Sequence, residues 1–152
     1  MAKVGGRLRL PPRIKVLEAL GSIADGRIKI IGDHEAIVSS STGERSYKVY
    51  LDVDKGVAYS DDNGTRYRGY IGYPIIAFLM LRGILPFDKM LADALKGIPW
   101  KTLNEKYKRY AVVEAIVKRE AAKKGVTGRK LNAFVKEVMN RLARLEIRYQ
   151  PP

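Results

Sequence analysis

Residues 27–60, RIKIIGDHEAIVSSSTGERSYKVYLDVDKGVAYS, decide the fold class of this chain. Tyr47, Val49 and Leu51 alternate with more polar side chains, which is the two-residue period of a half-buried β-strand. Glycine, serine and aspartate fill the intervening positions, and these residues favour tight turns. The stretch therefore predicts an antiparallel meander of about four short strands, at 27–31, 36–39, 47–51 and 57–60.

Helical patterns lie on both sides of the meander. Apolar side chains recur at helical spacing after Pro12, and Gly26 supplies the stop. After the meander, residues 75–82 are almost entirely apolar, so we expect a buried helix there. Asp88 can cap a further short helix that ends before Gly97.

The strongest helix signal of the sequence begins at Thr102. Thr102 and Glu105 have the spacing of a capping box, in which two side chains satisfy free backbone donors at a helix start. We expect this helix to run to about Lys124, after which residues 125–128 turn the chain. A last helix follows, and its apolar residues step by four and three, which favours an antiparallel hairpin with the helix before it. These residues are Leu131, Val135, Val138, Leu142 and Leu145.

Together these elements predict an α+β protein. A small antiparallel β-meander packs with a buried helix and is followed by a C-terminal basic antiparallel helical hairpin. Three segments are expected, and the last two could form one compact unit. They are a basic arm at 1–11 that is flexible unless it docks, an α+β domain at 12–97, and the hairpin at 98–152.

The positive charge of the chain is unevenly distributed. Its formal net charge is +13, from 29 basic and 16 acidic residues. Residues 27–71 hold seven of each and are neutral, whereas residues 101–152 hold fourteen basic and five acidic residues, a net charge of +9. Such an excess favours polyanions, because each phosphate neutralised by Lys or Arg releases condensed counterions. The predicted electrostatic surface is therefore the helical hairpin, helped by the arm.

The candidate nucleic-acid-binding residues are basic side chains of the hairpin, the arm and one loop. The strongest group surrounds the turn at 125–128, which gathers four of them at the hairpin tip. A solvated surface is the alternative interpretation of the same charges. The full set is Lys108, Arg109, Lys118, Arg119, Lys123, Lys124, Arg129, Lys130, Arg66, Arg68, Arg7 and Arg9.

Residues 65–73 interleave arginine with tyrosine. Exposed tyrosine rings could stack on unpaired bases while Arg66 and Arg68 hold phosphates. Alternatively, Tyr67, Tyr70 and Tyr73 pack over the edge of the buried helix, which is the interpretation we favour.

A set of spaced segments within residues 12–81 matches a known module. The segments are Asp25–Arg27, Tyr47–Val49, Gly56–Asp62 and Gly72–Leu79. In their spacing and hydrophobic pattern they resemble SWIM domains, small ββα zinc modules associated with DNA or protein interaction.

The zinc-ligand positions of that family fall here on Ala58, Ser60, Gly72 and Pro74. These four residues cannot make a tetrahedral zinc site. The resemblance therefore implies a degenerate, metal-free SWIM-like domain with an interaction role rather than chemistry of its own.

The sequence offers little for metal or catalytic chemistry. It has no cysteine and a single histidine, His34, which excludes disulfides, thiol catalysis and Cys-based zinc sites. Asp61–Gly64 lacks the spaced ligands of a calcium loop and is predicted to be a turn. No glycine-rich phosphate loop or G-x-S-x-G elbow occurs. We therefore predict a protein that is not an enzyme and has no cofactor or metal; a deep polar pocket with convergent carboxylates would revive the enzyme hypothesis.

Composition also suggests where the protein works. No stretch has the length of a membrane span, and no secretion signal follows Met1, so we expect the cytoplasm. A single glutamine and 30% charged residues are typical of heat-adapted proteins, which predicts a thermophilic, archaeal source.

The first functional hypothesis is a nucleic-acid-associated protein that contacts DNA or RNA mainly through phosphates, with little base readout. The alternative is a protein-interaction adaptor, whose hairpin docks on an acidic partner in a larger ribonucleoprotein or DNA-processing assembly.

Overall fold

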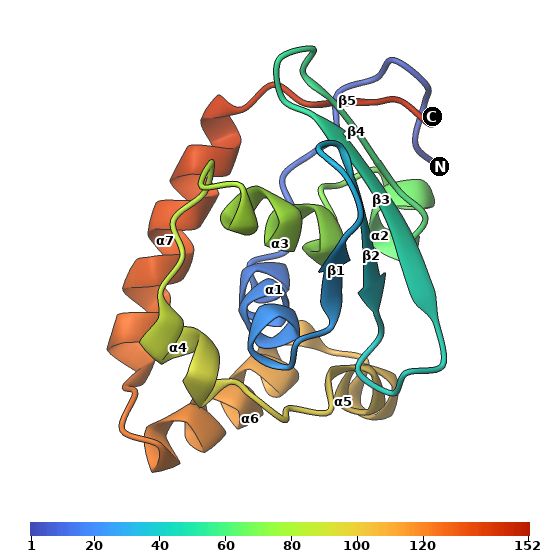
Figure 1. Cartoon of the computed structure of the whole chain (residues 1–152). Helices are drawn as coiled ribbons and strands as arrows, with labels where there is room; N and C mark the ends of the chain where they lie inside the picture. Colours follow the sequence, from blue (N-terminus) through green and yellow to red (C-terminus); the bar gives the residue numbers. More distant parts are fainter.

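The computed structural model describes residues 1–152 and shows an α+β fold with one five-stranded sheet and seven helices (Figure 1). The sheet forms one side of the molecule, and most of the helices lie to one side of it. The predicted fold class is therefore confirmed. None of the helices is both long enough and apolar enough to cross a membrane.

All four predicted strands are present and form an antiparallel meander in sequence order. Alternation of side chains buries Val38, Val49 and Ala58 beneath the sheet. A fifth strand, β5, pairs in parallel with β4, and its two residues are too few to show a period. The strands are β1 (Ile28–Ile30), β2 (Glu35–Ser39), β3 (Ser46–Asp52), β4 (Val57–Ser60) and β5 (Arg148–Tyr149).

The buried helix predicted after the meander is α3 (Tyr73–Leu81), in which nearly every residue is buried. It packs against the sheet on one side and against α1 (Ile14–Ala24) on the other (Figure 1). One core of 36 buried residues includes Phe78 of α3 together with Val117 and Leu142. The meander and the C-terminal helices therefore share a single hydrophobic core.

The long helix predicted from Thr102 is wrong, because the structure has two helices there, α5 (Trp100–Tyr107) and α6 (Tyr110–Lys123). The break falls at Lys108, whose φ of 53° is the left-handed conformation that ends helices. The predicted capping box is also absent, since α5 already begins after Pro99 and has no side-chain cap. The chain therefore changes direction at Lys108.

Asp61–Gly64 is not the plain turn that the sequence predicts. A one-turn helix, α2 (Asn63–Arg66), begins there. The Asp62 carboxylate caps it by accepting a hydrogen bond from the Thr65 amide at 3.1 Å. This carboxylate stabilises the helix start because the first backbone amides of a helix have no intrahelical partner.

Two further helices have a side chain that caps their first turn. Asp88 caps α4 (Lys89–Ala94), as predicted, and Thr127 caps α7 (Gly128–Arg144). The predicted apolar stripe of α7 is buried, and only its last member, Leu145, lies beyond the helix and is half-buried.

Near their connecting turn, α6 and α7 run in opposite directions. The Lys118 side chain of α6 lies next to Gly128 of α7. Four residues further along each helix, Arg13 binds both Glu114 of α6 and Asn132 of α7. The contacting residues have decreasing numbers along α6 and increasing numbers along α7. The predicted antiparallel hairpin is therefore present next to the turn.

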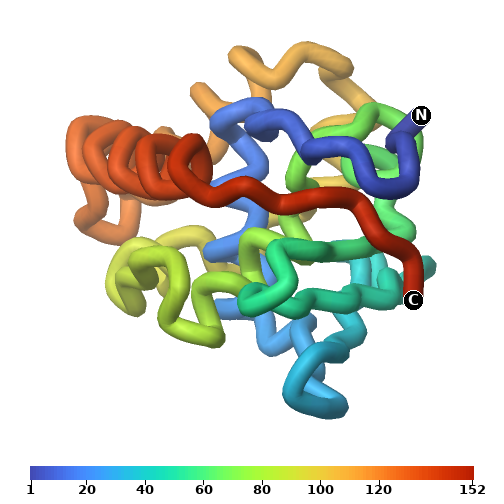
Figure 2. The backbone as a smooth tube through the Cα atoms, turned by 90° about the horizontal axis from the view of Figure 1, so that it is seen from above, coloured from blue at the N-terminus to red at the C-terminus, as the bar shows by residue number.

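The first eleven residues are docked. The Gly5 amide donates to the Tyr149 carbonyl at 2.8 Å, and the Leu8 amide donates to the Ile147 carbonyl at 2.8 Å. The Leu8 side chain is buried. Figure 2 shows this N-terminal segment beside the last residues of the chain. The sequence predicts an arm that is flexible unless it docks. In the structure, backbone hydrogen bonds and a buried leucine dock it.

Candidate functional site

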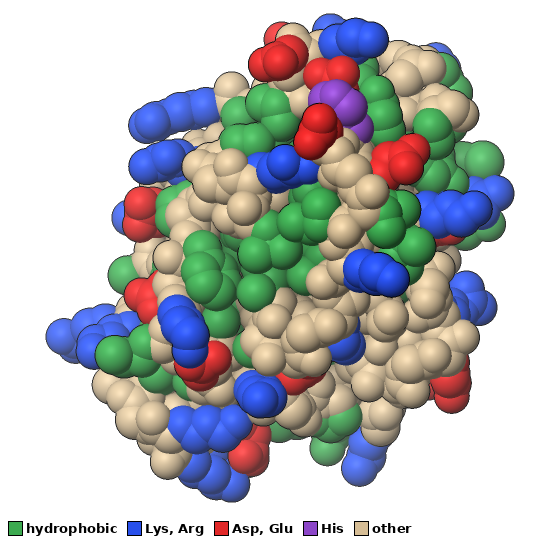
Figure 3. All heavy atoms as spheres, in the orientation of Figure 1, with side chains coloured by type: hydrophobic (Ala, Val, Ile, Leu, Met, Phe, Trp, Pro, Cys, Tyr) green, Lys and Arg blue, Asp and Glu red, His purple; other side chains and the backbone are tan.

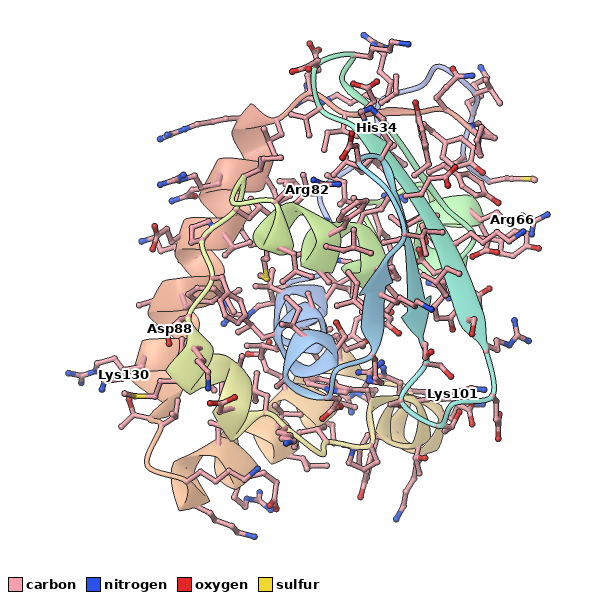
Figure 4. All side chains as sticks on the ribbon, viewed as in Figure 1. His34, Arg66, Arg82, Asp88, Lys101 and Lys130 are labelled. Carbon is pink, nitrogen blue, oxygen red and sulfur yellow. The ribbon has the colours of Figure 1, made fainter.

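A polar pocket of about 480 Å³ lies among α1, α2, α5 and the loop between β2 and β3. It forms where the start of α5 meets that loop (Figure 4). The Lys101 amide donates to Ser41 Oγ at 2.8 Å, and the Lys101 ammonium pairs with Glu44 at 2.8 Å. The lining side chains come from residues 15–18, 40–47, 62–73 and 100–110.

A buried ion pair lies against one side of this polar pocket. Lys15 Nζ lies 3.0 Å from Glu18 Oε1, and Asn104 Nδ2 donates to the same oxygen at 2.9 Å. Their side chains are only 13% and 5% exposed for Lys15 and Glu18. Burial lowers the pKa of Lys15, but the attraction of Glu18 and of Tyr110 outweighs burial, so the net shift is upward. Lys15 is therefore charged at neutral pH.

The Asp62 carboxylate lies on another wall. Thr65 Oγ1 donates to Asp62 at 2.8 Å and accepts from the Gly72 amide at 3.0 Å. Asp62 is buried, and burial raises its pKa, although hydrogen bonds from Ser60 and Thr65 oppose the shift. A Cβ on Gly72 would overlap the Asp62 carboxylate, so this close packing requires glycine. Asp62 thus joins the end of β4 to the start of α3.

Four tyrosines line the polar pocket. Tyr70 is buried, and its ring packs so closely on Gly64 that a Cβ there would overlap it. Burial raises the pKa of Tyr70 and of Tyr73 far above the ordinary 10.0, so both phenols stay neutral. Tyr47, Tyr73 and Tyr110 are only partly buried. The pocket therefore presents aromatic faces together with neutral hydroxyl groups.

Basic side chains occupy the exposed edge of the polar pocket. They are Arg45, Arg68, Lys101 and Lys108, and the acidic Glu105 lies among them. Lys108 is the one residue other than glycine with positive φ. In that conformation a side chain costs about 1 kcal/mol relative to glycine, and such strain concentrates at functional sites.

The basic and the acidic side chains occupy different parts of the polar pocket. The basic edge attracts an anion, whereas Glu18 and Asp62 disfavour negative charge deeper inside. The interior instead suits neutral groups that both donate and accept hydrogen bonds. Nowhere does the structure bring three His, Cys, Asp or Glu side chains together in a way that could hold a metal ion.

Some of the predicted nucleic-acid-binding residues lie at the polar pocket. Arg68 and Lys108 line it directly. The Arg9 guanidinium donates to the Arg68 carbonyl, and the Arg66 guanidinium stands 5.4 Å from the centre of the Tyr67 ring. The structure thus brings the arm and the Arg–Tyr loop together beside the pocket edge.

The candidates at the hairpin tip lie apart from this group. Arg66 and Lys130 project from opposite sides of the molecule (Figure 4). From Tyr110 at the pocket to Lys123, α6 spans about 20 Å. The hairpin tip is defined by Lys123, Lys124, Arg129 and Lys130, which are all exposed.

Ion pairs engage a minority of the candidates. Lys123 pairs with Glu120 at 3.0 Å, Lys118 pairs with Glu114 at 2.8 Å, and Arg7 lies 3.9 Å from Glu146. Lys124 donates to a backbone carbonyl at 3.1 Å. The exposed candidates without a carboxylate partner are Arg109, Arg119, Lys124, Arg129 and Lys130, as well as Lys108, Arg66, Arg68 and Arg9 at the pocket side.

Sequence reasoning did not identify the polar pocket. Its members are far apart in the chain, and none of them forms a known motif. One signal was present: Glu18 interrupts the apolar run from Val16 to Leu20 on the face that α1 buries. A carboxylate in such a run requires a partner, because an unpaired buried charge is costly.

Comparison with known proteins gives one family. The family model described as "Uncharacterised conserved protein UCP014422" matches residues 8–148, so the chain belongs to that family. No curated protein and no solved structure matches the chain. The resemblance of residues 12–81 to SWIM domains stays a prediction.

Proposed function

We propose that this protein binds nucleic acid, DNA or RNA, through phosphate contacts from its C-terminal helices and from the basic edge of the polar pocket. The observation that supports the proposal is the unpaired charge of residues 101–152. Of their fourteen basic residues four form ion pairs, which leaves ten without a carboxylate partner. The ten are Lys106, Lys108, Arg109, Arg119, Lys124, Arg129, Lys130, Lys136, Arg144 and Arg148.

Unpaired exposed cations suit a polyanion for a thermodynamic reason. Each Lys or Arg that contacts a phosphate releases condensed counterions, so affinity rises steeply as salt falls. Such contacts fix position but carry no sequence information by themselves. We place this binding in the cytoplasm, the compartment that the sequence predicts.

The carboxylates of the polar pocket favour binding over acid–base catalysis. Glu18 already accepts from Lys15 and Asn104, and Asp62 already accepts from Thr65. A general acid or base needs a lone pair or proton directed at the substrate, and here the fold holds Glu18 Oε1 and both oxygens of Asp62 in internal contacts. We therefore retain a non-enzymatic role as part of the proposal.

Salt-dependent binding of single-stranded and double-stranded oligonucleotides tests the proposal. Charge reversal of Lys124, Arg129 and Lys130 to Glu should lower affinity, and it should reduce the slope of log K against log salt by about one for each phosphate contact removed. Fluorescence anisotropy between about 50 and 200 mM salt measures both quantities.

A control triple variant changes net charge equally. Lys29→Glu, Lys48→Glu and Lys55→Glu alter exposed lysines of the neutral meander, and this variant should keep the wild-type slope. Salt-independent binding, absence of binding, or equal losses in both triple variants would contradict the proposal.

An adaptor role is a second candidate because of one apolar surface, which is separate from the hairpin that the sequence suggested for docking. Ile30 and Ile31 at the β1 edge are 45% and 52% exposed, and Leu81 at the end of α3 is 40% exposed. Figure 3 shows hydrophobic side chains gathered in the middle of this face, over α3 and β1. Protein partners that co-purify after nuclease digestion, and that are lost from an Ile31→Lys variant, would favour the adaptor.

A further inference from the structure

The polar pocket contains more than phosphate contacts require. A surface that only tracks a backbone needs exposed cations, and the hairpin tip has those. The pocket adds a partly open hollow of about 480 Å³, partly exposed tyrosine rings and a buried Lys15–Glu18 pair. That volume falls within the range of small-molecule sites, about 300–1,000 Å³.

The distribution of charge inside the polar pocket limits the ligand. Arg45, Arg68 and Lys108 are exposed at its edge, whereas Glu18 and Asp62 are buried. A compact, multiply charged anion placed deep inside would meet both carboxylates, while the Lys15 ammonium there is already paired with Glu18. The ligand that fits has its negative charge at one end and a neutral, hydrogen-bonding body at the other.

The aromatic side chains further restrict the chemistry of the neutral body of the ligand. Tyr47, Tyr73 and Tyr110 come from β3, α3 and α6 and present ring surface to the same hollow. Flat heterocycles stack on such rings, as bases do in single-strand-binding proteins. The Asn104 Oδ1 atom is buried here without a hydrogen-bond partner, so it can accept from an amino or imino group on the edge of a nucleobase.

We infer that the polar pocket binds one nucleoside phosphate, with the phosphate at Arg45, Arg68 and Lys108 and the base against Tyr110 and Tyr73. The ligand is either an unpaired nucleotide of a bound strand or a free mononucleotide, since both present the same chemistry. The inference rests on the proposed function only in its first form, because a free mononucleotide needs no hairpin tip.

Calorimetric titration with the 5′-monophosphates of the common nucleosides tests the inference, with inorganic phosphate and the matching nucleosides as references. At least one monophosphate should bind about tenfold more tightly than inorganic phosphate. Tyr110→Ala should weaken that monophosphate about tenfold by loss of ring contact, and Lys108→Ala should weaken it through the phosphate.

Both substitutions change exposed side chains, and a thermal melt establishes that each variant is folded. Lys130→Ala at the hairpin tip is the matched control and should leave monophosphate affinity unchanged. Monophosphates that bind no better than inorganic phosphate, or equal affinity in Tyr110→Ala, Lys108→Ala and wild type, would overturn the inference.

Titration with a single-stranded oligonucleotide separates the two sources. Loss of oligonucleotide affinity in Tyr110→Ala, together with competition by the monophosphate, assigns the pocket to a nucleotide of the strand. Unchanged oligonucleotide affinity in Tyr110→Ala assigns it to a free mononucleotide. Oligonucleotide binding without monophosphate binding defeats the pocket inference alone, and the reverse result defeats the proposed function alone.

Discussion

The hairpin tip and the polar pocket hold charged side chains in opposite ways. At the tip, Arg129 and Lys130 are exposed and unpaired, whereas in the pocket Lys15 and Glu18 are buried and paired. Exposed charges cost little to keep and are screened by salt, while a buried charge without a partner costs several kcal/mol. The hairpin tip is therefore suited to attracting a polyanion, and the polar pocket is suited to discriminating between ligands.

The largest expected effect tests whether the pocket pair supports the fold. Lys15→Met leaves the Glu18 carboxylate buried without its cation and should lower the free energy of unfolding by about 3–5 kcal/mol. Urea denaturation measures the loss. The double variant Lys15→Met, Glu18→Gln is the control and should recover much of it, and a double variant as unstable as the single one would contradict the paired-charge explanation.

A smaller loss is expected from the close packing around Asp62. Gly72→Ala places a Cβ against that carboxylate and should cost about 1–3 kcal/mol, as overpacking does elsewhere. Gly32→Ala is the matched control, because a Cβ there meets open space and its φ is not left-handed. Similar melting temperatures for the two variants would show that Asp62 moves aside without cost.

Glu114 lies between the two extremes, since its side chain is 14% exposed and holds both Arg13 and Lys118. Burial raises the pKa of Glu114, but the two cations outweigh burial and lower it below the ordinary 4.5. A lowered pKa means that the ionised group stabilises the fold above pH 4.5 and that this contribution disappears as pH falls through the native pKa.

Glu114→Gln should therefore cost about 1 kcal/mol at pH 7, an effect limited by solvent screening. The difference from wild type should shrink as pH is lowered below 4.5. Urea denaturation at pH 7 and at a pH below 4.5 measures this difference in the free energy of unfolding. A difference that does not depend on pH would exclude the ion pairs as its cause.

The smallest effect on stability belongs to the hairpin tip. Arg129→Ala and Lys130→Ala together should change the free energy of unfolding by no more than about 0.5 kcal/mol, while oligonucleotide affinity falls. A destabilisation comparable to that of Gly72→Ala would show that these residues serve the fold, and the contrast with the pocket would then fail.

Much of the fold was predictable because its signals are local. Period-two alternation located β3, turn residues separated it from β1, β2 and β4, and a run of apolar residues located α3. The break at Lys108 was not predictable, because left-handed helix ends usually carry glycine and this one carries lysine. β5 depends on pairing with residues about ninety positions earlier, and no local pattern reports such a contact.

The candidate site, too, was predictable only where its signals are local. Charge counting located the hairpin tip, since charge can be read residue by residue. The polar pocket depends on the fold, which brings Lys15 to Asn104 and Tyr110. Only Glu18, in an apolar helical run, hinted at it.

The pairing of both chain ends has a consequence for how the molecule folds. Gly5 and Leu8 bond to Tyr149 and Ile147, and β4 also pairs with β5. These are contacts of very high sequence separation, which form late because long loops must close first. During synthesis, the Gly5 and Leu8 amides cannot make these bonds until β5 has left the ribosome, whereas the Ala2 amide can already bond to the Arg66 carbonyl. We therefore expect the nascent meander and α3 to collapse early, with the β4 edge of the sheet left open until residues 148–149 have been synthesised.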